Sequence, residues 1–63
     1  MTCYMGEKGD WWELYDSSGS LIKLCLKSKY EYIDAFYHFV DYVNQTFSVE
    51  PTMENYEQYP GRV

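Results

Sequence analysis

The chain has 63 residues, enough for one hydrophobic core and too few for a second domain, because a chain of this length buries only about 60% of its unfolded surface. Ten Asp and Glu against five Lys and Arg give a formal net charge of −5. This excess of acid argues against direct binding to nucleic acid, whose phosphates are contacted mainly by cations. No apolar run approaches the ~18 residues of a membrane span, and the N-terminus lacks the features of a signal peptide. We therefore expect a cytoplasmic protein with no membrane contact.

Cysteine usage supports the same compartment. Cys3 and Cys25 are the two cysteines, and one disulfide between them is the alternative to two free thiols. Cys3 lies near the end of the chain and Cys25 in a predicted strand, so we expect free thiols and a reducing environment.

The first segment, residues 1–9, is interrupted by Gly6 and Gly9 and mixes charges without a period, which predicts a loose N-terminal arm. Residues 10–54 carry the periodic patterns of a single α+β domain. Residues 55–63 contain Asn55, Pro60 and Gly61 and are expected to form a C-terminal tail.

A β-hairpin is predicted between Asp10 and Lys27, where two apolar runs flank the turn Ser17-Ser18-Gly19. With Gly19 in the left-handed region of a three-residue loop, Asp16 faces Ser20, and pairs beyond them sum to 36 in residue number. The predicted core face carries Trp12, Leu14, Ile22, Leu24 and Leu26. The predicted outer pairs are Tyr15 with Leu21, Glu13 with Lys23 and Trp11 with Cys25. Opposite charges across strands favour the second of these pairs.

A helix is expected next, because Ser28-Lys29-Tyr30-Glu31 has the S-x-x-E pattern of a capping box. Asn44 or Gln45 is the expected end, since Asn tolerates a left-handed cap. At 100° per residue one broad apolar sector faces the hairpin. That sector holds Tyr32, Ile33, Phe36, Phe39, Val40, Val43 and Phe47.

After the helix, Phe47, Val49, Pro51 and Met53 alternate with polar residues, which indicates a half-buried strand. Pro51 restricts this strand to the edge of a sheet. A short helix from Pro51 to Tyr59 is the competing prediction. The order is therefore ββαβ, an α+β fold with a hairpin, one capped amphipathic helix and a third edge strand.

Catalytic and metal chemistry find little support in the sequence. His38 follows Asp34 by one helical turn, a pair that is more typical of a solvated helix surface than of an acid–base couple. Cys3, Cys25 and His38 have no spacing that would hold a metal ion from one element. We predict no catalytic residue, metal or cofactor, and a protein that is not an enzyme.

Two surfaces remain as candidate partner-binding sites. The first is the outer hairpin face with Trp11, Tyr15, Leu21 and Cys25, residues that include the aromatic types common in interface hot spots. The alternative is that the tail covers this face through Tyr56 and Tyr59.

The second candidate surface is an acidic stripe along the outside of the predicted helix. It consists of Glu31, Asp34, Tyr37 and Asp41. Carboxylates spaced along a rigid helix can replace phosphates in the basic site of a nucleic-acid-binding protein. A solvated helix face explains the stripe equally well.

The arrangement of Trp11–Tyr15, Ser17–Gly19, Leu21–Leu26 and Ser28–Asn44 in a short acidic chain resembles the plan of small phage-encoded inhibitors of host enzymes. These include inhibitors of uracil-DNA glycosylase and of bacterial RNA polymerase. The resemblance implies a non-catalytic blocker in the host cytoplasm that occupies a basic or nucleic-acid-binding site on a host protein. The alternative function is a homo-oligomeric structural or assembly protein, in the simplest case a homodimer.

Overall fold

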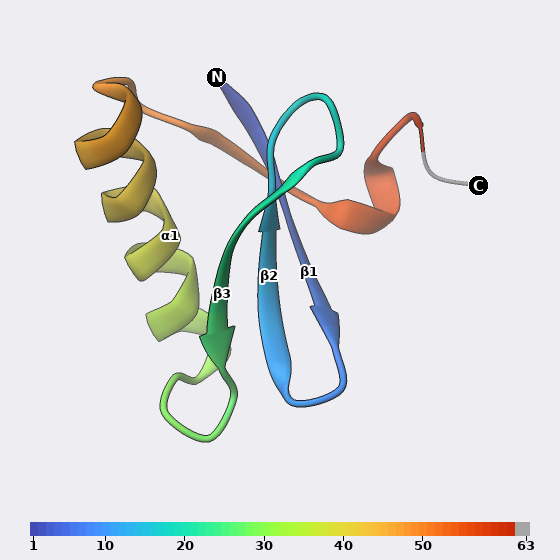
Figure 1. Ribbon diagram of the computed structural model, residues 1–63, viewed down its shortest axis with the longest axis vertical. Helices are drawn as coiled ribbons and strands as arrows, with labels where there is room; N and C mark the ends of the chain where they lie inside the picture. The colour runs from blue at the N-terminus through green and yellow to red at the C-terminus, as the bar shows by residue number, and fades with distance from the viewer. Residues whose placement is uncertain (62–63) are drawn as a thin grey trace.

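The fold is known from a computed structural model, which describes residues 1–61. It contains one helix and a four-stranded mixed sheet of order β3-β2-β1-β4, so the predicted α+β fold with a hairpin and one helix is confirmed (Figure 1). The elements are β1 (Thr2–Lys8), β2 (Trp11–Tyr15), β3 (Leu21–Leu26), α1 (Tyr32–Phe47), β4 (Thr52–Asn55) and a 3₁₀ helix (Tyr56–Gln58). Within this described part of the chain, no helix is long and apolar enough to cross a membrane.

The molecule has three layers. Figure 1 shows α1 on one side of the sheet and the segment after β4 on the other. We call the face toward α1 the inner face and the opposite one the outer face. The core lies between α1 and the inner face. Its buried residues are Cys3, Met5, Leu14, Cys25, Ala35, Phe39 and Val43.

Strand β1 corrects the prediction of a loose N-terminal arm at residues 1–9. It lies between β2, to which it is antiparallel, and β4, to which it is parallel. Cys3 and Met5 are buried on its inner face, while Tyr4 and Gly6 lie on its outer face. This is the period-2 alternation of a strand, which the glycines and mixed charges conceal in the sequence.

The hairpin turn forms as predicted. Gly19 has a φ of 87°, its N–H donates to the Asp16 carbonyl at 3.0 Å, and the Asp16 N–H donates to the Ser20 carbonyl at 2.9 Å. The Asp16 carboxylate also accepts hydrogen bonds from the hydroxyl and N–H of Ser18 and the N–H of Ser20. These hydrogen bonds, the Ser18 hydroxyl first, lower the Asp16 pKa and hold the turn closed.

The hairpin register holds at Tyr15–Leu21 and is wrong beyond it. A β-bulge makes Ile22 an extra residue on β3, so Leu14 pairs with Lys23 and Glu13 with Leu24. The predicted Glu13–Lys23 pair does not form, and the predicted faces of β3 are exchanged beyond the bulge. Cys25 is buried in the core at 3% exposure, whereas Leu24, predicted to be core, is 39% exposed on the outer face.

Helix α1 begins later and ends later than the capping pattern predicts. Ser28 lies in the turn after β3, and Glu31 is the N-cap residue without a side-chain capping hydrogen bond, so the predicted capping box is wrong. The N–H groups of Lys29 and Tyr30 both donate to the Leu26 carbonyl at 3.1 Å. These hydrogen bonds close a tight turn between β3 and α1. At the other end, Ser48 takes the left-handed conformation with a φ of 57°.

The buried line of α1 is narrower than the predicted apolar sector. Ala35, Phe39 and Val43 are fully buried, but Ile33 and Phe47 from the predicted sector are 52% and 43% exposed. Because α1 is the single helix on the inner face, no other element of the described chain packs beside it, and one flank of the helix remains partly open.

The predicted third edge strand is confirmed as β4, which pairs with β1, but it is shorter than predicted. Of its four predicted apolar positions only Met53 lies in β4, since Phe47 ends α1 and Val49 and Pro51 lie between the two elements. The competing helix is reduced to the 3₁₀ turn Tyr56–Gln58, in which the Glu57 N–H donates to the Asn55 side chain at 2.8 Å. The predicted tail thus begins as ordered structure on the outer face, and its last two positions, 62 and 63, lie outside the described residues.

Candidate protein-binding surfaces

An aromatic cluster covers one half of the outer face. Tyr56 stacks on Tyr15 with 4.0 Å between ring centroids, and Tyr59 meets the ring of Tyr4 edge-on at 5.1 Å. Tyr56 and Tyr59 also stack on each other at 5.7 Å. The alternative in which the tail covers the outer hairpin face therefore holds for the β1 half of the sheet.

Tyr15, a predicted partner-binding residue, belongs to this cluster and is half-buried. Its hydroxyl donates a 2.7 Å hydrogen bond to the Glu13 carboxylate. Burial and this hydrogen bond raise the pKa of Tyr15 to about 12. The ring thus packs mainly against the protein itself.

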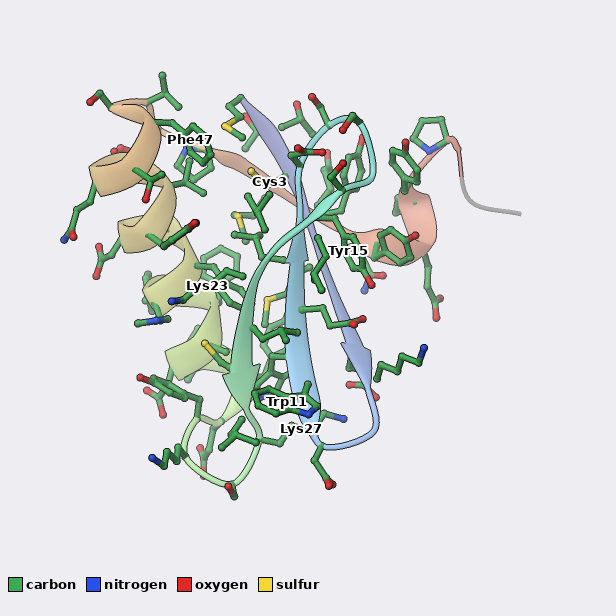
Figure 2. All side chains as sticks on the ribbon, viewed as in Figure 1. Cys3, Trp11, Tyr15, Lys23, Lys27 and Phe47 are labelled. Carbon is green, nitrogen blue, oxygen red and sulfur yellow. The ribbon has the colours of Figure 1, made fainter. Side chains whose placement is uncertain are left out.

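The other half of the outer face is open and apolar. Trp11 and Leu21, both predicted partner-binding residues, are 41% and 48% exposed, and Leu24 is 39% exposed. Trp11 lies opposite the half-buried Leu26 in the strand pair. Figure 2 shows Trp11 and Tyr15 at opposite ends of β2. The tail packs on Tyr15, whereas Trp11 stays open and Leu21, opposite Tyr15 on β3, is exposed beside the tail. We call Trp11, Leu21, Leu24 and Leu26 the β3 patch.

Sequence reasoning missed two members of this patch. Leu24 and Leu26 were predicted to be core residues because the register was extended through the bulge. No residue in the run Leu21–Leu26 is a glycine or proline that would mark a bulge. The same shift in register turns Cys25, which was predicted to face outward, into the core.

The acidic stripe lies on the opposite side of the molecule. Glu31, Asp34, Tyr37 and Asp41 are all exposed, and among residues 1–61 Tyr37 is the most open of the large apolar or aromatic side chains at 61%. Helix geometry places Asp34 and Asp41 away from the line that is buried against the sheet. The β3 patch and the acidic stripe therefore face different directions, and one flat surface cannot contact both.

A third surface runs along α1 beside its buried line, and we call it the helix flank. Its residues repeat at helical spacing: Ile33, Phe36, Tyr37, Val40 and Phe47. Ile33 and Phe47 are well exposed, while Phe36 and Val40 are half-buried. Only Tyr37 belongs to both the helix flank and the acidic stripe.

The side chains considered for catalysis or metal binding do not form a common site. His38 packs against the Tyr30 ring at 5.1 Å, and residues 1–61 show no hydrogen bond or ion pair between His38 and Asp34. Cys3 and Cys25 are free thiols, as predicted, and burial raises the pKa of both. In the described chain, no group of three or more His, Cys, Asp or Glu side chains is placed to hold a metal ion.

Comparison with known proteins supplies no family from which a function could be transferred, so a function has to be inferred from these surfaces. No protein-family model, curated protein or solved structure matches the chain.

Proposed function

We propose that the chain is a non-enzymatic inhibitor or modulator that binds a protein partner and covers part of its surface. The observation that supports this most directly is the β3 patch, where Trp11, Leu21 and Leu24 are each about two-fifths to one-half exposed. Apolar side chains grouped around a tryptophan are typical of interface centres, where a few such anchors supply most of the binding energy.

The acidic stripe supports a basic partner, such as a nucleic-acid-binding protein of the host cytoplasm. Helix α1 carries Asp34 and Asp41 and no Lys or Arg, and Glu31 precedes it directly. Because the two surfaces face different directions, the partner contacts them with separate segments. A basic surface meets the carboxylates and speeds encounter, while apolar contacts at the β3 patch slow dissociation.

Two variants with equal side-chain chemistry test the β3 patch. Leu24→Asp places a carboxylate in the patch, whereas Val49→Asp places one in the loop before β4, and both leucine and valine are 39% exposed. A partner recovered by affinity purification should bind the Leu24→Asp and Trp11→Ala variants at least about tenfold more weakly than the parent. The Val49→Asp variant should bind like the parent. If all three variants bind every recovered partner equally well, the proposal is wrong.

The acidic stripe is tested separately through kinetics. Asp34→Asn and Asp41→Asn should slow association with the purified partner at low salt and leave dissociation unchanged. Raising the ionic strength should abolish the difference from the parent, because exposed charges are screened. Equal association rates at low salt would exclude steering by this face.

The helix flank favours a second candidate function, self-association into a structural or assembly dimer. Ile33, Tyr37 and Phe47 are each about two-fifths to three-fifths exposed along this flank, so the sheet leaves them largely uncovered. Sedimentation equilibrium should then show a dimer at micromolar concentration that Ile33→Asp converts to monomer. A parent protein that is monomeric at that concentration excludes a stable assembly of this kind.

A further inference from the structure

The backbone of β3 is unpaired with any described strand along the edge that faces away from β2. β3 is a terminal strand of the sheet, and the Lys27 N–H donates to the Asp10 carbonyl at 2.8 Å. Hydrogen bonding alternates along an antiparallel pair, so Lys23 and Cys25 bond to β2 while Leu24 and Leu26 direct their backbone groups away from it. The Leu26 carbonyl indeed accepts from Tyr30, outside the sheet. The N–H and carbonyl of Leu24 and the N–H of Leu26 are therefore placed to pair with an added strand.

This edge is basic in an otherwise acidic chain. Residues 21–30 contain Lys23, Lys27 and Lys29, three of the five Lys and Arg, and none of the ten Asp and Glu. Lys27 lies 3.5 Å from the Glu7 carboxylate. The Lys23 ammonium lies over the Tyr42 ring at 5.1 Å and has no carboxylate within ion-pair distance among residues 1–61. A negative charge beside Lys23 would find a cation that is not yet neutralised.

The two faces at this edge differ in chemistry. Figure 2 shows the Lys23 side chain extending toward α1, on the inner face with Lys27. The outer face at the same edge is the β3 patch. A strand added to β3 presents alternate side chains to these two faces. Its inner positions would meet lysines and its outer positions would meet leucines.

We propose that β3 binds an extended segment of a protein partner in which acidic and apolar residues alternate, by adding that segment as a fifth strand. The acidic residues face Lys23 and Lys27, and the apolar residues cover Leu24 and Leu26. This inference rests on the proposed protein-binding function and specifies the chemistry recognised at the β3 patch. It concerns one segment of the partner and is independent of the basic surface proposed to face α1.

A second copy of the chain fits this edge less well. Antiparallel pairing of two β3 strands would bring Lys23 and Lys27 of both copies onto neighbouring positions of one face, and like charges across strands are destabilising. The bulge at Ile22 also shortens the regular edge to Lys23–Leu26. Charge complementarity therefore selects an acidic segment over self-pairing.

The test uses a synthetic peptide of alternating glutamate and valine. Titration into the isotope-labelled protein should shift the NMR amide signals of Leu24 and Leu26 and protect both amides from hydrogen exchange. A peptide with lysine in place of glutamate should bind at least about tenfold more weakly, as should a peptide of the same composition in which glutamates and valines form separate blocks. Signals that shift on α1 instead of β3 would overturn the assignment.

Backbone pairing is tested without altering the protein. In an added strand, alternate peptide N–H groups point toward β3 and the others point away. N-methylation of the central valine or of the central glutamate should therefore weaken binding about tenfold in one case and hardly at all in the other. The sensitive position also reports whether the strand adds parallel or antiparallel. Equal effects at both positions would exclude strand addition.

Recognition of the peptide's charge is tested by reversing the charge of Lys23. Lys23→Glu should lose the glutamate peptide and gain the lysine peptide, whereas the control Lys8→Glu, two strands away on β1, should keep the preference of the parent. A parent protein that dimerises through β3 and ignores every peptide would overturn the inference in favour of self-pairing. Peptide failure combined with loss of partner binding by Leu24→Asp would reject this inference and leave the proposed function standing.

Discussion

The Tyr56 ring stacks on the Tyr15 ring at 4.0 Å with an interplanar angle of 19°, and this contact decides which half of the outer face is open. Gly6 lies directly beneath, since a Cβ at this position would come within 3.1 Å of the Tyr56 Cβ. The segment after β4 can thus lie close to β1. Trp11 and Leu24 remain beyond its reach, and the exposed surface is confined to β3 and the end of β2.

The hydrogen bond from Tyr15 to Glu13 predicts an unusual titration. The pKa of Tyr15 is about 12 in the folded protein, against 10 for an ordinary tyrosine, because burial and the Glu13 carboxylate both disfavour the phenolate. Ultraviolet absorbance should show a tyrosine ionisation near pH 12 that the Tyr15→Phe variant lacks, and Glu13→Gln should lower the pKa of this step.

Folding stability should follow the same titration. Between pH 10 and 12 the unfolded chain has lost the Tyr15 proton while the folded protein retains it, so the free energy of unfolding falls as pH rises through this window. The contribution is fully present below pH 10. Tyr15→Phe should remove this part of the pH dependence, and an unchanged slope in that variant would contradict the assignment.

Alanine substitutions at two glycines with positive φ distinguish the cost of backbone strain from the cost of a steric clash. Gly9 has a φ of 58° and open space around it, whereas a Cβ at Gly19, with a φ of 87°, would lie 2.7 Å from the Tyr59 hydroxyl. Chemical denaturation should give a loss of roughly 1 kcal/mol for Gly9→Ala and about 2–3 kcal/mol for Gly19→Ala. Equal losses would mean that Tyr59 does not pack on the turn.

The bulge in β3 is tested by two leucines that the simple hairpin register places together in the core. Leu14 is fully buried and Leu24 is 39% exposed. Leu14→Ala should cost about 2–5 kcal/mol of unfolding free energy and Leu24→Ala less than about 1 kcal/mol. Similar large losses at both positions would restore the unshifted register.

The two cysteines should be poorly reactive in the folded protein. Cys3 and Cys25 are 0% and 3% exposed, and burial raises the pKa of each thiol, so the nucleophilic thiolate is both rare and inaccessible. Alkylation followed by mass spectrometry should proceed roughly tenfold or more slowly than in denaturant. The added thiol of a Val49→Cys variant serves as the exposed reference, and comparable rates at all three sites would show that the core opens readily.

Local patterns were sufficient for several elements. Asp16 and Gly19 specify the hairpin turn through short-range hydrogen bonds and a left-handed φ, and both features are present in the structure. The helical periodicity located α1, and Pro51 correctly restricted the following strand to the edge of the sheet. The candidate residues Trp11 and Leu21 were also correctly expected to be exposed. Leu21 precedes the bulge, and an extra residue on β3 does not change the face that Trp11 occupies on β2.

Tertiary pairing decided the rest. Cys3 and Met5 become a central strand only because β2 and β4 are available on both sides, and a residue's own neighbours carry no record of those distant partners. The bulge at Ile22 shifts the pairing of β3 with β2 by one residue, and it moves Leu24 from core to surface. From the sequence alone come an acidic, aromatic α+β domain, its turn and its helix. Which apolar residues remain exposed is a property of the packed sheet, because a shift of one residue exchanges its two faces.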